Sequence, residues 1–202
     1  MRYQRLYYYF RSAFSSFLCN EIIKQGFINN PQMATTGYSQ PRNKKELNNI
    51  LQKRKSNISW IGDWWLKKEL APYVIRANKM AGWNFNLSNS EDCQFTKYDE
   101  KEHYGWHTDS FIAPHTDGSW KGLIRKISVT VSLSDPNDYE GGFLEFALPK
   151  NEPDSFEYIK AREALPRGSI IVFPSYTWHR VTPVTKGTRL SLVQWNLGPG
   201  YV

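Results

Sequence analysis

Apolar residues change their spacing near the middle of the chain. Before about residue 82 they recur every three or four positions, in segments that open on residues able to cap a helix. These segments predict three helices, from Ser12 or Ser15 to about Lys24, over 44–54, and from Asp63 to about Met80. Pro72 falls inside the third segment, so we expect a kink or a break there. The stretch 29–43 is rich in Asn, Pro, Gly, Ser and Thr and predicts a loop.

Two of these helices carry an apolar stripe that would face a sheet. In the first the stripe is Phe14, Phe17, Leu18, Ile22 and Ile23, and in the third it is Trp64, Trp65, Leu66, Leu70, Val74 and Ile75.

From Cys93 onward the apolar residues recur with a period of two, in short runs separated by turn residues such as Gly141-Gly142. The runs are 93–98, 104–109, 123–133, 143–147, 169–173, 178–184 and 189–196. Many short strands at this spacing predict a mainly β protein, a jelly roll (double-stranded β-helix) with the N-terminal helices packed on one sheet. We therefore expect a helical support region over 1–92 and the jelly roll over 93–202, as one structural unit.

Charge is unevenly distributed along the 202 residues. The net charge is +7: residues 1–92 carry 14 Lys/Arg against 6 Asp/Glu, whereas residues 93–202 carry 12 against 13. An acidic partner or nucleic acid could dock on the basic half. A solvated basic face is the preferred interpretation, because no block of like charges is long enough to form an interaction tail.

Cysteine and apolar content point to the reducing interior of a cell. Two isolated cysteines, Cys19 and Cys93, make neither a disulfide framework nor a zinc site. No run of eighteen apolar residues predicts a membrane span, and Arg11 interrupts the apolar run near the N-terminus that would otherwise resemble a signal peptide. A cytoplasmic protein is expected.

The strongest candidate site is His107-Thr108-Asp109 together with the distant His179. Residues i and i+2 of a strand project from the same face, so His107 and Asp109 can present a nitrogen and an oxygen to one point. His179 on another strand would complete a set of two histidines and one carboxylate. Such a set leaves coordination positions open, which is typical of non-haem iron(II) oxygenases, whereas structural zinc fills four positions with protein ligands.

A second candidate is Arg189, ten residues after His179 and on the following strand. Its guanidinium would bind a carboxylate through two parallel hydrogen bonds, and Ser191 on the same face would add a hydroxyl donor. A buried arginine needs a partner, which a bound dicarboxylate would supply.

Three segments in order resemble the prolyl 4-hydroxylase-like family of 2-oxoglutarate/Fe(II) oxygenases, in particular its PKHD-type branch. They are 104–109 (YGWHTD), 133–142 (LSDPNDYEGG) and 173–189, which contains Phe173-Pro174, Trp178-His179-Arg180-Val181-Thr182-Pro183-Val184 and Gly187-Thr188-Arg189. The resemblance covers about residues 93–197. Three motifs in the right order are far more specific than any one of them.

The resemblance implies Fe(II), 2-oxoglutarate and O2, with ascorbate as a further candidate. His107, Asp109 and His179 match the iron ligands, and Arg189 matches the residue that pairs with the far carboxylate of 2-oxoglutarate. Tyr98 falls near a position where the family often has a tyrosine beside the cosubstrate. Ser132 stands where some animal relatives have a second tyrosine. The retained carboxylate favours hydroxylation, because halogenating relatives lack it.

Other residues have a structural interpretation beside the functional one. His115-Thr116-Asp117 repeats the metal motif, but it follows Pro114 and is expected to form a loop over the site. Tryptophans 106, 178 and 195 could line a substrate pocket, although tryptophan is more often a core residue. Tyr176 and Arg180 flank His179 and are candidate substrate contacts.

The expected substrate is a prolyl residue in a peptide or protein. A free amino acid or another small molecule is the alternative substrate. AlkB-like nucleic-acid demethylation is disfavoured, because that family has an arginine six residues after the first and this chain has Trp195. Two other classes remain open, a metal-free jelly-roll binding module and a cupin-like enzyme that uses another metal without 2-oxoglutarate.

Overall fold

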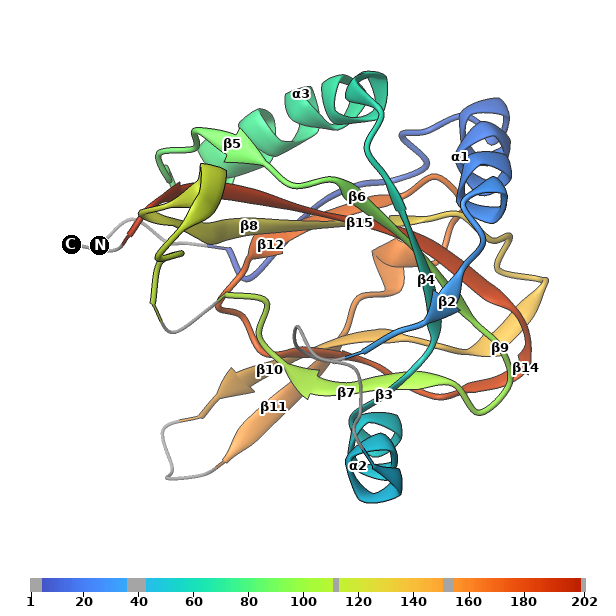
Figure 1. The fold of residues 1–202 in the computed structure, drawn as a ribbon. Coiled ribbons are helices and arrows are strands. Elements are labelled where there is room, and N and C mark those ends of the chain that lie inside the picture. Colours follow the sequence, from blue (N-terminus) through green and yellow to red (C-terminus); the bar gives the residue numbers. More distant parts are fainter. Residues whose placement is uncertain (1–4, 36–42, 111–112, 151–154, 201–202) are drawn as a thin grey trace.

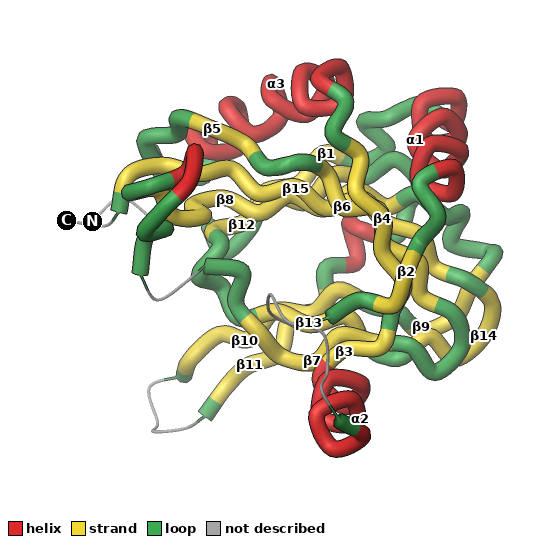
Figure 2. Tube along the Cα trace, viewed as in Figure 1, coloured by secondary structure: helices red, strands yellow, loops and turns green. Residues whose placement is uncertain are grey.

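Two antiparallel sheets face each other across the interior, and helices cover the outer side of the larger sheet (Figures 1 and 2). The structure is a computed structural model that describes residues 5–35, 43–110, 113–150 and 155–200. The mainly β jelly roll predicted from the sequence is confirmed.

The helices are α1 (Ser16–Ile28), α2 (Lys44–Lys53) and α3 (Trp64–Met80), with short 3-10 turns η1 (Gly118–Trp120) and η2 (Arg162–Ala164). The strands are β1 (Tyr8–Phe10), β2 (Gln32–Met33), β3 (Arg54–Lys55), β4 (Asn57–Ile61), β5 (Asn89–Ser90), β6 (Cys93–Tyr98), β7 (His103–His107), β8 (Leu123–Ser132), β9 (Tyr139–Gly141), β10 (Leu144–Pro149), β11 (Phe156–Lys160), β12 (Ile170–Pro174), β13 (His179–Val181), β14 (Val184–Gly187) and β15 (Arg189–Pro199).

The larger sheet runs in the order β1-β12-β8-β15-β6-β4-β2, with β5 paired to β15. The smaller sheet runs β11-β10-β13-β7-β3, and β14 pairs with β9 in a separate ribbon. Strands from both halves of the sequence therefore build each sheet. The division at residue 92 stays a prediction, but the first half supplies strands as well as helices.

Apolar and polar side chains alternate along the strands of the larger sheet. The apolar ones face the helices, and the polar ones face the smaller sheet. On β8, Ile127, Val129 and Val131 belong to the apolar cluster under the helices. The intervening Ser128, Thr130 and Ser132 are also buried, but they face the other way, toward the smaller sheet. Strands β6 and β15 follow the same rule, which places polar side chains between the two sheets.

Helices α1 and α3 pack on the outer face of the larger sheet, as expected (Figure 1). Ser15 caps α1 by accepting a hydrogen bond from the Leu18 amide at 3.2 Å. Helix α1 approaches the sheet closely at Gly26, where a Cβ atom would lie 2.3 Å from the Phe95 ring. Helix α2 differs from the expectation, because it lies beside β3 and β7 of the smaller sheet.

Several local predictions were wrong. Phe17, Trp64 and Ile75 are exposed, because the buried face of each helix is narrower than the predicted stripe. Helix α3 is not broken at Pro72, which lies on its exposed side. The loop 29–43 contains the two-residue strand β2, and its part 36–42 lies outside the described residues. No helix in the described residues has the length and apolarity needed to cross a membrane.

Candidate iron and 2-oxoglutarate site

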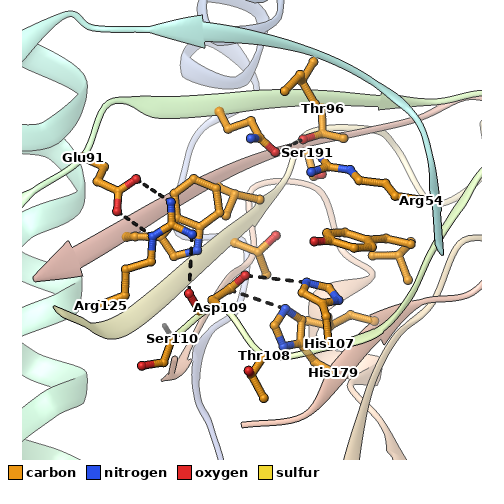
Figure 3. A pocket seen from close by; sticks show the side chains of 18 of the residues that line it. Arg54, Glu91, Thr96, His107, Thr108, Asp109, Ser110, Arg125, His179 and Ser191 are labelled. Atoms are coloured by element: carbon orange, nitrogen blue, oxygen red, sulfur yellow. Dashed lines mark hydrogen bonds and ion pairs between the residues drawn. The ribbon is translucent and has the colours of Figure 1, made fainter. Parts of the chain in front are cut away.

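His107, Asp109 and His179 meet inside the molecule (Figure 3). One potential ligand atom from each residue lies within 4.8 Å of the other two. The Nε2 atoms of His107 and His179 are 3.6 Å and 3.5 Å from the two carboxylate oxygens of Asp109. Among the described residues, this is the only group of three or more such side chains that could hold a metal.

Strand pairing brings the three residues together. In the smaller sheet β7 pairs with β13, and His107 lies directly opposite His179. The predicted run 104–109 is shorter than expected, because β7 ends at His107. Asp109 follows the strand end, where its backbone N–H donates to the Ser175 carbonyl at 2.9 Å. That hydrogen bond holds Asp109 beside the histidines although the strand has already ended.

Both histidines are held in the tautomer that leaves Nε2 free to bind a metal. The Nδ1 atom of His107 lies 2.8 Å from the Gly105 carbonyl, and Nδ1 of His179 lies 2.9 Å from the Thr177 carbonyl. A carbonyl oxygen only accepts, so each Nδ1 carries the proton and each Nε2 keeps a lone pair. A backbone carbonyl behind a ligating histidine is a common outer-shell arrangement.

The Asp109 carboxylate is held in its ionised form. Burial would raise its pKa, but the neighbouring His179 and, after it, His107 lower it well below the usual range. The Ser128 hydroxyl donates to Oδ2 at 2.7 Å, and Ser128 in turn lies 2.9 Å from the Ser175 hydroxyl. Burial lowers the pKa of His179 to about 4, so this imidazole is neutral near pH 7.

The donor set fits a divalent transition metal with open coordination positions. Two imidazole nitrogens and one carboxylate oxygen, within 4.8 Å of one another, match the two-His, one-carboxylate pattern of non-haem Fe(II). The structure brings together the three residues that the sequence predicted as metal ligands, and their role as iron ligands is a proposal.

A cavity of about 790 Å³ extends from this cluster between the two sheets. Arg189, Tyr98 and Ser191, the residues that the sequence suggested for cosubstrate binding, all line it, and all three are buried. Arg189 lies directly across from Tyr98 in the β15–β6 pair, and its Nη1 donates to the Ser191 hydroxyl at 3.2 Å. Gly142 adopts φ +58°, and a Cβ atom there would lie 2.8 Å from Cδ of Arg189.

The Arg189 end of the cavity fits a carboxylate. In the described part of the chain, the one hydrogen-bond partner of the Arg189 guanidinium is the neutral Ser191, and no described carboxylate forms an ion pair with it. The Ser132 hydroxyl, opposite Ser191 on β8, is buried and has no hydrogen-bond partner among these residues. A bound anionic group would supply a counter-charge to the buried Arg189 and an acceptor to the buried Ser132 hydroxyl.

Three further features of the cavity, and the contact of Ser128 with Asp109, were not predicted. Arg54 and Tyr104 enter it from β3 and β7. Arg125 forms hydrogen bonds of 2.5 and 2.6 Å to the Glu91 carboxylate, and its guanidinium lies 3.9 Å from the Trp195 ring centre (Figure 3). The sequence pattern that could have pointed to Ser128 is the polar residue at every second position of β8. No sequence pattern pointed to Arg54, because a two-residue strand is too short to show a period.

The remaining candidates separate into cavity and surface residues. Trp195 lines the cavity and is buried, and His115 lines it from a loop, as expected. Trp106, Trp178, Tyr176 and Arg180 are not among the lining residues. Trp106 instead stacks on Tyr158 at 5.1 Å between ring centres, and Trp178 is half exposed.

The family model of the 2OG-Fe(II) oxygenase superfamily matches residues 93–196. This segment covers just over half of the chain and contains the His107, Asp109, His179 and Arg189 positions. The chain therefore belongs to the 2OG-Fe(II) oxygenase superfamily, whose cofactor and cosubstrate are iron(II) and 2-oxoglutarate.

Curated relatives carry the description PKHD-type hydroxylase YbiX. Those from Escherichia coli (strain K12 / DH10B) and Escherichia fergusonii are each 36% identical to this chain over 101 residues. The match spans 50% of this chain and 40% of each relative's length.

Solved structures share the fold over nearly the whole chain. A viral collagen prolyl hydroxylase from Paramecium Bursaria Chlorella virus-1, in a 2OG complex, has a TM-score of 0.64 and 19% identity over 96% of this chain and 97% of its own. A Pseudomonas putida prolyl-4-hydroxylase has a TM-score of 0.65 and 18% identity over 95% and 92%. At this identity the likeness shows the fold alone.

Proposed function

We propose that this chain is an Fe(II)/2-oxoglutarate-dependent dioxygenase that hydroxylates an unactivated C–H bond, with a prolyl residue in a peptide or protein as the substrate. The overall reaction converts the substrate C–H, 2-oxoglutarate and O2 into C–OH, succinate and CO2. The observation that carries the proposal is that one cavity holds both the two-His, one-carboxylate cluster and Arg189, which forms no ion pair with a described carboxylate.

Each residue has a role that follows from its contacts. His107, Asp109 and His179 would hold iron(II), which, together with 2-oxoglutarate, supplies the activation of O2. Arg189 would orient the far carboxylate of the cosubstrate, with Ser191 as a second donor and Tyr98 beside it. The ionised Asp109 and the neutral imidazole of His179 offer lone pairs near pH 7 without first losing a proton.

Two observations favour a peptide substrate. A cavity of about 790 Å³ is large enough for a five-carbon dicarboxylate and for part of a second molecule. Among structures with the same fold, one Trichoplax adhaerens prolyl hydroxylase is in complex with a hypoxia inducible factor peptide fragment (TM-score 0.60, 17% identity). For this chain, a prolyl peptide is the substrate that we would test first.

The test measures succinate formed from 2-oxoglutarate in the presence of Fe(II), O2 and ascorbate, with proline-containing peptides or free amino acids added. We expect a peptide to stimulate succinate formation and to gain the mass of one oxygen atom, and Asp109→Ala to abolish both. Stimulation by a free amino acid alone would replace the peptide with a small-molecule substrate. Metal binding without any 2-oxoglutarate binding would contradict the proposal in favour of a cupin-like enzyme.

A further inference from the structure

Three side chains from neighbouring strands form a continuous stack that ends on a candidate iron ligand. The rings of Tyr104 and His107 are almost parallel, with 3.5 Å between their centres and 13° between their planes. The guanidinium carbon of Arg54 lies 4.5 Å from the centre of the Tyr104 ring. His107 already covers one face of Tyr104 at van der Waals distance, so Arg54 occupies the opposite face.

The pairing of β3 with β7 creates this arrangement. Arg54 is the partner of Tyr104 in the register of the two strands. Gly105 lets them approach, since a Cβ atom there would lie 3.1 Å from the Lys53 carbonyl oxygen. The short strand β3 therefore holds a cation over the ring that covers His107.

The Arg54 guanidinium is fixed by neutral groups rather than by a carboxylate. Its Nε donates to the Ser56 hydroxyl at 2.9 Å, and Nη2 donates to Oε1 of Gln94 at 2.8 Å. The residue is 6% exposed, and no described carboxylate forms an ion pair with it. The face of the Tyr104 ring adds to these two hydrogen bonds in compensating the buried charge, and cation–π attraction is strongest in such desolvated sites.

The stack restricts the orientation of the His107 ring plane, which the other contacts described for this ring do not fix. The bond from Nδ1 to the Gly105 carbonyl fixes the tautomer of His107, but a single hydrogen bond still allows the ring to tilt about it. Two electron-rich rings repel each other when stacked face to face. A cation on the far face of Tyr104 draws its π density away from His107 and so favours the parallel stack.

His179 is oriented by a different kind of contact. Its Nδ1 hydrogen bond has the same i−2 geometry, but its aromatic neighbour Phe173 meets it edge to face, at 4.7 Å and 63°. Phe173 comes from β12 of the larger sheet, and no guanidinium lies behind that ring in the described contacts. The stack with a cation behind it thus distinguishes His107 from His179.

We propose that Arg54 and Tyr104 are positioning residues that fix the ring plane of His107 and thereby set the affinity and geometry of the metal site. This inference rests on the proposed iron site. The competing role for Arg54, which lines the same cavity, is direct recognition of an anionic group of the cosubstrate.

The experiment loads the full chain with Co(II) under anaerobic conditions and records its visible absorption, its Co(II) dissociation constant and its affinity for 2-oxoglutarate. The variants are Tyr104→Leu, which removes the ring, Tyr104→Phe, which keeps it, and Arg54→Met, which removes the charge but keeps a similar stem. Arg76→Met is the matched control, because Arg76 also lies over an aromatic ring, 5.9 Å from the centre of Phe10, but on helix α3.

We expect Tyr104→Leu to raise the Co(II) dissociation constant roughly tenfold and to shift the absorption spectrum. Arg54→Met should raise the constant about threefold with a smaller shift in the same direction. Tyr104→Phe and Arg76→Met should match the wild type. The 2-oxoglutarate affinity should change only as far as the metal affinity does.

Wild-type Co(II) spectra and affinities in both Tyr104→Leu and Arg54→Met would overturn the proposal. Weaker 2-oxoglutarate binding by Arg54→Met with an unchanged Co(II) spectrum would also overturn it, and would assign Arg54 to the anion. If Tyr104→Leu does not fold, Arg54→Met decides alone. Failure of the wild type to bind Co(II) would instead contradict the proposed function.

Discussion

The Asp109 carboxylate shows how a single residue is prepared for metal binding. Ser128 donates to one of its oxygens, the Ser175 carbonyl accepts from its backbone N–H, and the two serine hydroxyls contact each other. These contacts fix the carboxylate although the strand has already ended at His107. Its position therefore depends on residues from β8 and from the turn after β12.

Ser128→Ala should weaken Fe(II) or Co(II) binding roughly tenfold, because the carboxylate loses the hydrogen bond that orients Oδ2. The dissociation constant can be measured by anaerobic titration. Ser59→Ala is the control, since Ser59 is also a buried serine, with its hydroxyl bonded to the Gly26 carbonyl and away from the cluster. Equal metal affinities in the two variants would contradict a positioning role for Ser128.

Gly142→Ala should weaken 2-oxoglutarate binding roughly tenfold, because the new methyl group would lie 2.8 Å from Cδ of Arg189 and displace the guanidinium. The variant also carries backbone strain of about 1–2 kcal/mol, since φ is +58°. Gly122→Ala isolates that strain: φ is +80° there, and no atom lies within 4 Å of the added Cβ. We expect both variants to be less stable but only Gly142→Ala to bind the cosubstrate weakly.

At the scale of the elements, long alternating runs were predictable from the sequence. The runs 93–98 and 123–133 correspond to β6 and β8 within one residue, because one face of each strand packs under the helices. The run 178–184 is divided into β13 and β14. Pro183 lies between them and cannot donate to a ladder, while its carbonyl accepts from the Gly142 amide.

Short edge strands were not predictable. Strands β2, β3 and β5 have two residues each, and β1 has three, so they have no readable period. They exist because a distant partner strand offers free backbone groups. The same reasoning applies to the site: its candidate ligands carry a local motif, whereas Arg54 reaches the cavity only through the long-range pairing of β3 with β7.

Pro72→Ala should raise the free energy of unfolding by about 2 kcal/mol. Pro72 lies inside α3 and cannot donate the backbone hydrogen bond of that turn, which costs roughly 3 kcal/mol in a helix interior, partly offset by the stiffer unfolded chain. Its side chain is exposed, so little packing is lost. The check is chemical denaturation of both proteins. A lower unfolding free energy for Pro72→Ala would show that α3 depends on the proline for its packing.

The whole molecule places its two cysteine thiols in the apolar core and its polar candidate site between the sheets. Cys19 and Cys93 are fully buried in the cluster under α1 and α3, whereas the candidate site is reached from the cavity. Burial raises the pKa of Cys93 to about 12 and also raises that of Cys19. We therefore expect both thiols of the folded protein to react slowly with thiol reagents, and at the rate of a free cysteine after unfolding.

The same burial gives a pH dependence of stability. The ordinary pKa of the thiol is 9.0 and the folded value for Cys93 is about 12, so between these values the folded state keeps a proton that the unfolded state loses. This contribution to stability is complete below pH 9 and falls as pH rises. In denaturation at pH 8 and pH 10.5, the stability gap between the wild type and Cys93→Ala should shrink at the higher pH. A constant or widening gap would be inconsistent with a buried, protonated Cys93.

The most direct test of the central claim is the visible spectrum of the protein with Fe(II) and 2-oxoglutarate under anaerobic conditions. Chelation of iron(II) by the 2-oxo acid produces a metal-to-ligand charge-transfer band. We expect the band in the wild type, none in His179→Ala, and in Arg189→Ala a roughly 10- to 100-fold higher 2-oxoglutarate requirement, because a charge-assisted pair is lost. A folded wild-type protein that shows no band with excess iron and cosubstrate would contradict the assignment of this cavity as a 2-oxoglutarate/Fe(II) site.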